Sequence, residues 1–481
     1  MPPSSLAFVG SLNSRGMDRS LAGIDTAAFS VAMMFHPNPN ALDIFGNKSQ
    51  SDARRRCYPD SSSTATATEV GLFDLHLRVA ILYIVSYGGR LSTPSCAEEI
   101  DASMNNLGLN MSLILDGNAT VETPWGLAKA YVDETFAYLS ENDGWNADGS
   151  MSRDYNRIPF SDYKYEDSDG NSWEPYTPEN SPWEFKKKKN WQPLTEHDDL
   201  GYLYSQMHVT PHIGALARFY GFNSTQDETD FGSRELEDPK YDYNNASLEV
   251  LEESRLMATD EFKQVSLAFF DNKFSSLVPL KIAYFLRDPS NNSPQEFYRV
   301  TLLNQLAIYN GIILSWREKV RHDLPRPPSI ITSLYGDTMF ETYAGPGQGV
   351  QMIKASEWEP FIRTMPHSEF PSASACLCQV FTEQMIEYTG SDTLDPPLVF
   401  PLSENVTLEL SSWSEVSDLC GNGRLWGGMH FSDAVPAGAG LCGGGLLASS
   451  MAASVDRLIW GDETAAIFKS NPGELKVRPY N

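Results

Sequence analysis

The sequence has few basic residues for its length. Its 481 residues include 36 Lys and Arg against 63 Asp and Glu, which gives a formal net charge of −27. A general nucleic-acid binder needs a basic surface, and a protein that docks on anionic lipids needs a basic patch, so we expect neither kind of partner. Any site for an anion must therefore be a local cationic pocket that works against the charge of the whole chain.

Cysteine and long apolar runs are also scarce. Six cysteines in 481 residues do not indicate a disulfide scaffold, and Cys376 and Cys378 are too close in sequence to pair easily, so we predict buried thiols. No apolar run reaches about 18 residues, which predicts no membrane span. The first 20 residues lack a charged segment followed by a long apolar stretch. This predicts no secretory signal and leaves the compartment open.

The remaining composition is that of a globular protein. Hydrophobic residues make up 41% of the chain and aromatic residues 11%, which is enough for a large core. Residues 1–70 are rich in Ser, Asn, Pro and Gly, so we expect a loop-rich N-terminal extension. Over residues 71–481 helical periodicity dominates and strand-like alternation is rare, which predicts one large all-α domain with long loops.

Capping residues and helix breakers mark the ends of the predicted helices. Thr123 is a predicted cap with Pro124 at the first helical position, and Gly390 is a predicted helix end. In chain order, the predicted helices cover about 124–143, 247–273, 294–323, 372–390 and the residues after the glycine cluster 443–445. The polar, aromatic stretch 143–200 is typical of a functional loop or lid, and we interpret its run Lys186–Lys189 as a solvated face.

A pair of cations lies in the segment KVRHDLPRPP. Lys319 and Arg326 are seven residues apart, close to two helical turns of about 7.2 residues, so they would share a face if the helix continued. We expect Pro325 to end the helix first, so a turn must bring Arg326 round. Two cations that converge there would neutralise an oxyanion.

A helix start follows in the segment HSEFPSASAC. Pro371 ends an extended stretch, and Ser372–Ser374 begin the helix. Backbone N–H groups at a helix N-terminus point at an anion, and a serine hydroxyl adds a donor. The alternative interpretation is an ordinary helix cap.

The third segment, GRLWGGMHFSD, places Arg424 six residues before His430. Gly427 and Gly428 lie between them and allow a close backbone approach or a turn. Taken alone, an Arg or a His at these positions would more often be structural than functional.

Together and in this order, the three segments resemble the motifs of the vanadium haloperoxidase and type 2 phosphatidic acid phosphatase superfamily. That pattern is Lys-x6-Arg-Pro, then Pro-Ser-Gly-His, then Ser-Arg-x5-His, and both internal spacings agree here. The motif region covers residues 319 to about 435. Residues 190–199 and 208–222 resemble, more weakly, the helical region that precedes the motifs in haloperoxidase-like members. The resemblance implies an all-α fold with two four-helix bundles around a vanadate or phosphate site.

The resemblance also implies roles for single residues. His430 would bind the metal axially in a vanadate enzyme, or attack phosphorus in a phosphatase, and a neutral imidazole suits both tasks. Lys319 would also polarise the peroxide. The equatorial oxygens of vanadate or phosphate would be held by Lys319, Arg326, Arg424, Ser372 and the backbone amide of Ala373.

Three positions depart from the family pattern. Ala373 replaces a Gly, a small change if only the amide is used, and Gly423 replaces a Ser, which removes one hydroxyl. Ser374 replaces the acid–base His, whose help is typically worth about 10²–10⁴-fold. Haloperoxidase-like bacterial and microalgal members also show PSAS, so the site need not be inactive. His322 and His367 are the candidates for a substitute proton relay, or else are structural.

These expectations favour a vanadium-dependent haloperoxidase in which Lys319, Ser374 and His430 are catalytic. Vanadate would be the cofactor, and phosphate could occupy the same site. Hydrogen peroxide, a halide and a small organic acceptor would be the partners, with bromide or iodide preferred over chloride, and a homo-oligomer is compatible with the sequence. The alternatives are an acid phosphatase with His430 as nucleophile and a non-catalytic oxyanion-binding protein. Candidates for a halide pocket, by proximity to the motifs, are Trp316, Trp358 and Phe370.

Overall fold

The computed structural model describes residues 27–30, 67–92, 97–115, 120, 123–142, 165–166, 172–173, 176–197, 203–206, 208, 218–287, 294–462 and 464–468. Most of the expected N-terminal extension therefore lies outside the described residues. The helices are α3 (Ala67–Ser92), α4 (Ala97–Asn106), α5 (Ser112–Leu115), α6 (Pro124–Asn142), α8 (Thr225–Gly232), α9 (Tyr243–Met257), α10 (Glu261–Asp271), α11 (Lys273–Arg287), α12 (Pro294–His322), α13 (Pro327–Tyr335), η3 (Ala355–Glu357), α14 (Ala373–Thr389), α15 (Ser414–Trp426), α16 (Ala434–Cys442) and α17 (Leu446–Ile459).

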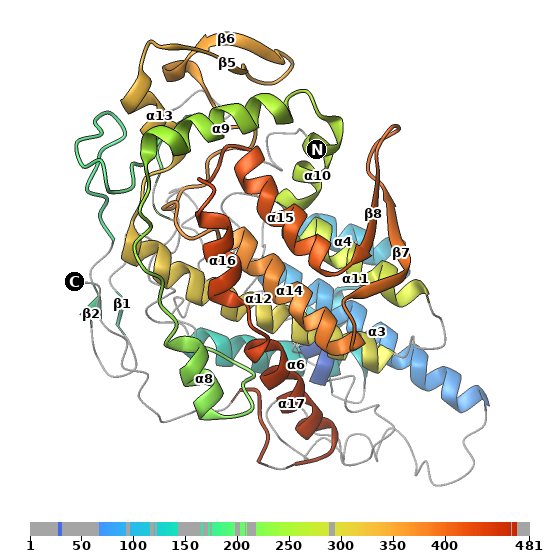
Figure 1. Cartoon of the computed structure of the whole chain (residues 1–481). Coiled ribbons are helices and arrows are strands. Elements are labelled where there is room, and N and C mark those ends of the chain that lie inside the picture. The colour runs from blue at the N-terminus through green and yellow to red at the C-terminus, as the bar shows by residue number, and fades with distance from the viewer. Residues whose placement is uncertain are drawn as a thin grey trace.

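The fold is mainly helical, as the sequence predicts, and its described strands form only two-stranded antiparallel sheets. The β7–β8 hairpin projects beyond the helices next to it in Figure 1. The paired strands are β1 (Tyr165–Glu166) with β2 (Ser172–Trp173), β3 (Thr195–His197) with β4 (Leu203–Ser205), β5 (Met339–Tyr343) with β6 (Val350–Lys354), and β7 (Thr393–Pro401) with β8 (Thr407–Ser412).

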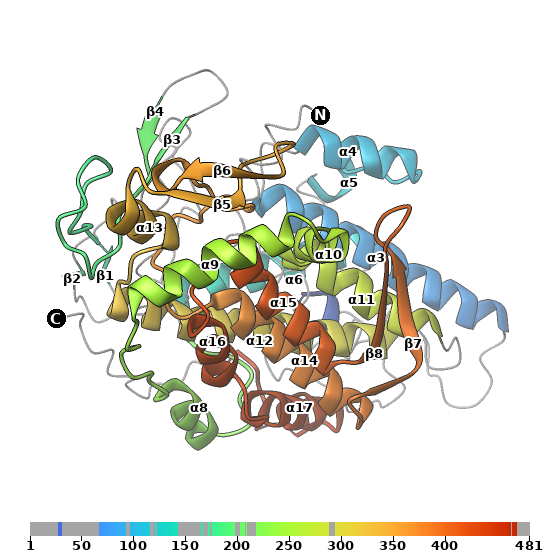
Figure 2. The same ribbon diagram turned by 45° about the horizontal axis from the view of Figure 1, so that its top comes forward.

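The main core surrounds α12 and α14. Figure 1 shows α14 across the middle of the molecule, in contact with α12, α15, α16 and α17. The middle of α12 is buried on every side, which marks it as a central helix rather than a surface one. α9 and α10 pack against α15 (Figure 2), and a second apolar cluster joins α3 to α6.

Most predicted helix ends are confirmed. The hydroxyl of Thr123 accepts the Gly126 amide at 3.1 Å at the start of α6, and α12 begins at Pro294. Gly390 ends α14 with a φ of 68°, a left-handed conformation that favours glycine. The single helix expected over 247–273 is wrong: it is two helices, α9 and α10. The chain breaks between them because the side chain of Asp260 caps α10 by accepting the Lys263 amide at 3.1 Å.

The expectation of buried thiols is also wrong. Cys376 is bonded to Cys442 and Cys378 to Cys420, so α14 is covalently joined to the end of α16 and to α15. The cysteines are buried as predicted, but their partners lie 66 and 42 residues away, where no local pattern indicates them.

One described stretch, Ala434–Ile459, is long and apolar enough to pass a composition test for a membrane span. It consists of α16 and α17 with a break between them, and 56% of its apolar window is buried in the protein. Such a pattern is also typical of core helices, and both helices pack on α14.

The expectation that residues 190–199 belong to a helical region is wrong. Trp191–Leu194 are irregular and β3 follows, because Pro193 disfavours helical geometry at the residue before it. Residues 208–222 lie mostly outside the described residues. The preceding lysine run, Lys186–Lys189, is exposed, as a solvated face should be.

Candidate functional site

The turn after α12 brings the first two cations together. α12 ends at His322, before Pro325, and Asp323 takes a φ of 50° that reverses the chain. The carbonyl of Asp323 accepts the Trp191 amide at 2.6 Å, which fixes this turn. The helix therefore stops as the sequence predicts, and α13 begins directly after Arg326.

Lys319 is fully buried and its ammonium group has three backbone acceptors. Nζ donates to the carbonyls of Ser368 at 2.9 Å, Glu369 at 2.8 Å and Pro371 at 2.5 Å. Lys319 thus holds the stretch that leads into α14. Contact with an oxyanion would exchange one of these bonds, because an ammonium group has only three protons.

Arg326 is fully buried and joins the first motif to the other two. Nε donates to the carbonyl of His367 at 2.9 Å, and Nη1 donates to the carbonyl of Met429 at 2.8 Å and to Nε2 of His430 at 3.1 Å. Burial lowers the pKa of Arg326 to about 10, so the guanidinium remains charged at neutral pH.

The start of α14 presents backbone donors. Ser372 is the N-cap, and its hydroxyl oxygen accepts the Ala375 amide at 3.3 Å. The amides of Ala373 and Ser374 occupy the first two helical positions, where an α-helix offers no intrahelical acceptor. α16 lies so close to this end that a Cβ on Gly438 would come within 2.1 Å of the Ser372 carbonyl oxygen.

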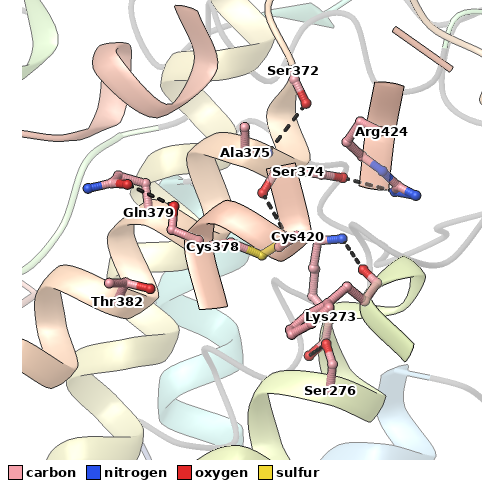
Figure 3. The surroundings of a disulfide bond; sticks show 12 residues. Lys273, Ser276, Ser372, Ser374, Ala375, Cys378, Gln379, Thr382, Cys420 and Arg424 are labelled. Carbon is pink, nitrogen blue, oxygen red and sulfur yellow. Dashed lines mark hydrogen bonds between the residues drawn. A yellow bond between two sulfur atoms is a disulfide. The ribbon is translucent and has the colours of Figure 1, made fainter. Parts of the chain in front are cut away.

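Arg424 lies at the C-terminal turn of α15 with its guanidinium beside Ser374 (Figure 3). Nη1 donates to the Ser374 hydroxyl oxygen at 3.2 Å, and both Nη atoms donate to Oδ1 of Asp271 at 3.1 and 3.0 Å. The side chain is only 3% exposed, and its Nε atom is buried without an acceptor. A buried donor without a partner is costly, which marks this face of Arg424 as one that could receive an anion.

His430 is buried, and its two ring nitrogens have different partners. Nδ1 lies 3.0 Å from Oε1 of Glu369, and Nε2 accepts from Arg326. These partners assign the proton to Nδ1 and the lone pair to Nε2. Burial and the positive charges of Arg326, Lys319 and Arg424 lower the pKa of His430 well below its usual value, so the ring is neutral at neutral pH.

Glu369 is the functional candidate that the sequence analysis missed. It is fully buried, and Oε1 accepts from Nδ1 of His430 and from the Phe431 amide at 3.1 Å, while Oε2 accepts from the Tyr241 hydroxyl at 3.1 Å. Burial raises the pKa of Glu369 to about 7, although Arg326 and Lys319 oppose the rise. A proton on Oε2 would leave Oε1 as the acceptor for His430, so the ring keeps its tautomer in both states. The only signal in the sequence was a lone acidic residue inside the second motif.

The glycines between Arg424 and His430 permit a close approach, as the sequence predicts. Gly428 has a φ of 75°, and a Cβ there would lie 2.7 Å from the ring of Trp358. Trp358 is thus buried against the turn that presents His430. Trp316 packs on His367, with ring centroids 4.8 Å apart, and Phe370 packs on His322 at 4.9 Å. All three aromatic candidates are buried among side chains.

The two additional histidines lie in different surroundings. His367 adjoins the site, because Nη2 of Arg326 lies 3.0 Å from its Nδ1. His322 instead pairs with Asp238, at 2.9 Å, and lies 3.6 Å from Glu318. Burial opposes ionisation of Glu318, but hydrogen bonds from His322 and its neighbours outweigh burial and lower the pKa of Glu318 to about 2. His322 is therefore part of a separate ion-pair cluster.

The polar atoms that these residues present are of the kinds that bind an oxyanion. The amides at the start of α14 and the unpartnered Nε of Arg424 are donors suited to oxygen atoms. The lone pair on Nε2 of His430 is suited to a central vanadium or phosphorus atom. Arg326 and His430, which are 104 residues apart, are in contact, and the ammonium group of Lys319 is bonded to backbone carbonyls.

The chain is similar to known proteins in sequence over part of its length and in fold. Residues 299–459 match the family described as the VCPO second helical-bundle domain. The fold resembles the apo form of a bacterial vanadium-dependent chloroperoxidase, with a TM-score of 0.72, 22% identity, and coverage of 96% of this chain and 97% of the other. It also resembles the holo form of a bacterial vanadium-dependent chloroperoxidase, with a TM-score of 0.72, 21% identity and coverage of 96% and 95%. A bacterial vanadium-dependent iodoperoxidase has a TM-score of 0.56, 15% identity and coverage of 93% and 94%. No curated protein sequence gives a significant match.

Proposed function

We propose that this protein is a vanadium-dependent haloperoxidase that uses hydrogen peroxide to oxidise a halide. The observation that carries the proposal is a neutral imidazole held among buried cations, with an unpartnered guanidinium nitrogen nearby. The helical-bundle match over 299–459 and the fold of the bacterial haloperoxidases support the same assignment.

The proposed residue roles follow from the contacts. Vanadate, when bound, supplies a Lewis acid that activates hydrogen peroxide toward a halide without changing its own oxidation state. Arg326, Arg424 and the amides of Ala373 and Ser374 would hold its oxygens, with the Ser372 hydroxyl as a further donor and Lys319 as a nearby positive charge. His430 would bind through Nε2, because Glu369 keeps the proton on Nδ1.

Ser374 bears on which halide is oxidised. Its hydroxyl oxygen accepts from Arg424, so its own proton is free to donate to a bound oxygen. A hydroxyl does not exchange protons at neutral pH as an imidazole does, and the missing help is typically worth about 10²–10⁴-fold. We therefore expect bromide and iodide, which are easier to oxidise, to be preferred over chloride.

The test is to titrate the purified apoprotein with orthovanadate and then to measure peroxide-dependent halogenation of a phenol with iodide, bromide and chloride. His430→Ala should abolish vanadate binding and turnover, while His322→Gln, a change at a buried histidine outside the site, should retain both. Bound vanadate with no halide oxidation between about pH 5 and 8 would contradict the proposal, and would leave an oxyanion-binding protein.

The second candidate is a phosphatase with His430 as nucleophile. The Glu369 carboxyl group on Nδ1 favours it, because this contact keeps the lone pair on Nε2, the atom that would attack phosphorus. Ser374 disfavours it, because a departing alkoxide needs a proton donor. Phosphate release from a simple monoester that His430→Ala abolishes, without halide turnover, would select this function instead.

A further inference from the structure

α14 and α15 lie antiparallel beside the proposed oxyanion site. Contacts between them run in opposite chain directions: Ser374 with Arg424 at 3.2 Å, the Cys378–Cys420 disulfide, and then Gln379 with Ser417 at 2.8 Å. Figure 3 shows the disulfide next to the Ser374–Arg424 contact. Cys378 is four residues after Ser374, and Cys420 is four residues before Arg424. Each cysteine therefore lies one helical turn from a site residue, on the same face of its helix.

The part of α15 that carries Arg424 is a poor helix by composition. Gly421 and Gly423 lie between Cys420 and Arg424, and Gly427 follows the helix. Glycine inside a helix is destabilising relative to alanine, because the unfolded backbone has more freedom to lose. A covalent bond at Cys420 fixes the helix just before this weak stretch, and so restricts where the guanidinium of Arg424 can lie.

We propose that the Cys378–Cys420 disulfide is a positioning element for the oxyanion site. It holds Arg424 and Ser374 at the separation that lets both contact one tetrahedral anion. The inference rests on the proposed function only in assuming that this site binds such an anion. Breaking the bond should weaken anion binding through Arg424 while leaving the contacts of His430 in place.

The second disulfide provides a matched control. Cys376 lies on another side of α14, where its sulfur contacts the Gly311 carbonyl oxygen of α12 at 3.4 Å. Its partner Cys442 is the last residue of α16, at the end of that helix away from His430. Both bridges are buried and anchored in α14, but only Cys378–Cys420 reaches the helix that carries Arg424.

The experiment compares binding of inorganic phosphate to the folded apoprotein by isothermal titration calorimetry, with orthovanadate as a second probe. We expect the Cys378→Ala/Cys420→Ala variant to bind at least about tenfold more weakly than wild type, as when one charge-assisted hydrogen bond is lost. The Cys376→Ala/Cys442→Ala variant should stay within about twofold, a difference too small to reflect a lost contact of that kind. Circular dichroism establishes whether each variant is folded. If the Cys378→Ala/Cys420→Ala variant is not folded, the Cys378→Ala/Cys420→Val variant, whose valine fills more of the vacated volume, replaces it.

A double-mutant cycle separates positioning from general loosening. In an Arg424→Gln background, loss of Cys378–Cys420 should weaken phosphate binding no further, because the group it positions is already absent. Three results would overturn the inference. The Cys378→Ala/Cys420→Ala variant could bind phosphate as tightly as wild type, or removal of either bridge could weaken phosphate binding equally. Removal of Cys378–Cys420 could also weaken phosphate binding as much in the Arg424→Gln background as in wild type. A wild-type protein that binds neither phosphate nor vanadate would instead reject the proposed function.

Discussion

Removing the two disulfides should destabilise the protein by amounts that are more than additive. The bridges close chain segments of 66 and 42 residues, and the shorter segment lies inside the longer one. Closing either loop alone in the unfolded chain removes about 4.4 or about 3.9 kcal/mol of loop entropy, respectively. In the wild-type protein, however, each bridge acts on a chain that the other has already shortened.

Because one loop lies inside the other, the stability lost on removing either bridge depends on whether the other bridge is present. With Cys378–Cys420 in place, Cys376 and Cys442 are separated by a path of 24 residues, two on one side and 22 on the other. Closing that path is worth about 3.4 kcal/mol. With Cys376–Cys442 in place, Cys378 and Cys420 are joined by parallel paths of 42 and 24 residues. Together these behave as a loop of about 15 residues, worth about 3 kcal/mol.

The assay is equilibrium unfolding in urea of wild type, the two single-bridge variants and the variant without bridges, all with alanine at the changed positions. We expect losses in the free energy of unfolding of about 3, 3.4 and 7.4 kcal/mol, so the last exceeds the sum of the first two by about 1 kcal/mol. A combined loss smaller than that sum would refute the nested-loop reasoning, as would either single loss below about 1 kcal/mol.

Three further changes test other parts of the structure. Glu369→Leu should lower the free energy of unfolding by about 2–5 kcal/mol, because it leaves the three donors to the Glu369 carboxyl group unpaired. Nitrogen NMR should then show His430 losing its single tautomer, whereas Glu369→Gln should keep that tautomer. The pKa of Glu318 is lowered to about 2, from a value near 4.5 in the unfolded chain. The contribution of its carboxylate to the free energy of unfolding is therefore complete above about pH 4.5, and it is lost as the pH falls to about 2. Glu318→Gln should thus be less stable by about 2 kcal/mol at pH 7, and acid urea titrations should show the gap closing. Gly428→Ala should lower the free energy of unfolding by about 2–4 kcal/mol in thermal unfolding, because Gly428 has a φ of 75° and a Cβ there would lie 2.7 Å from Trp358. Gly390→Ala is the control, because a Cβ there would meet nothing within 4 Å, and it should cost about 1 kcal/mol.

The sequence predicts those parts of the site that depend on local geometry. Proline and glycine mark the start of α12 and the end of α14, since each acts on its own backbone. The end of α12 before Arg326 follows from Pro325, and the helix start at Ser372 follows from capping. Such signals span about one or two helical turns, so they can be recognised in the sequence without knowledge of the fold.

Long-range pairing is what the sequence could not supply. The disulfides, the Asp271–Arg424 ion pair and the Glu369–His430 contact each join residues at least 42 apart. Cysteine count alone leaves the connectivity undetermined, and a glutamate in a turn has no spacing that assigns it to a histidine. The break between α9 and α10 has a local signal, the capping residue Asp260. The apolar periodicity on both sides of Asp260 nevertheless favoured one continuous helix.

The buried charges of the proposed site would explain how a protein with a net charge of −27 could bind an anion. Three buried cations, Lys319, Arg326 and Arg424, face two contacting or nearby carboxylates, Glu369 and Asp271. Because burial raises the pKa of Glu369 to about 7, its carboxyl group is only partly ionised at neutral pH, so positive charge exceeds negative charge among these groups. An uncompensated buried cation costs several kcal/mol. A singly charged oxyanion would remove that cost, whereas the surface charge acts through water and is screened within about 10 Å at 0.1 M salt. The proposed anion affinity would thus depend on the buried groups, and on the bonds that hold them together, rather than on the overall charge.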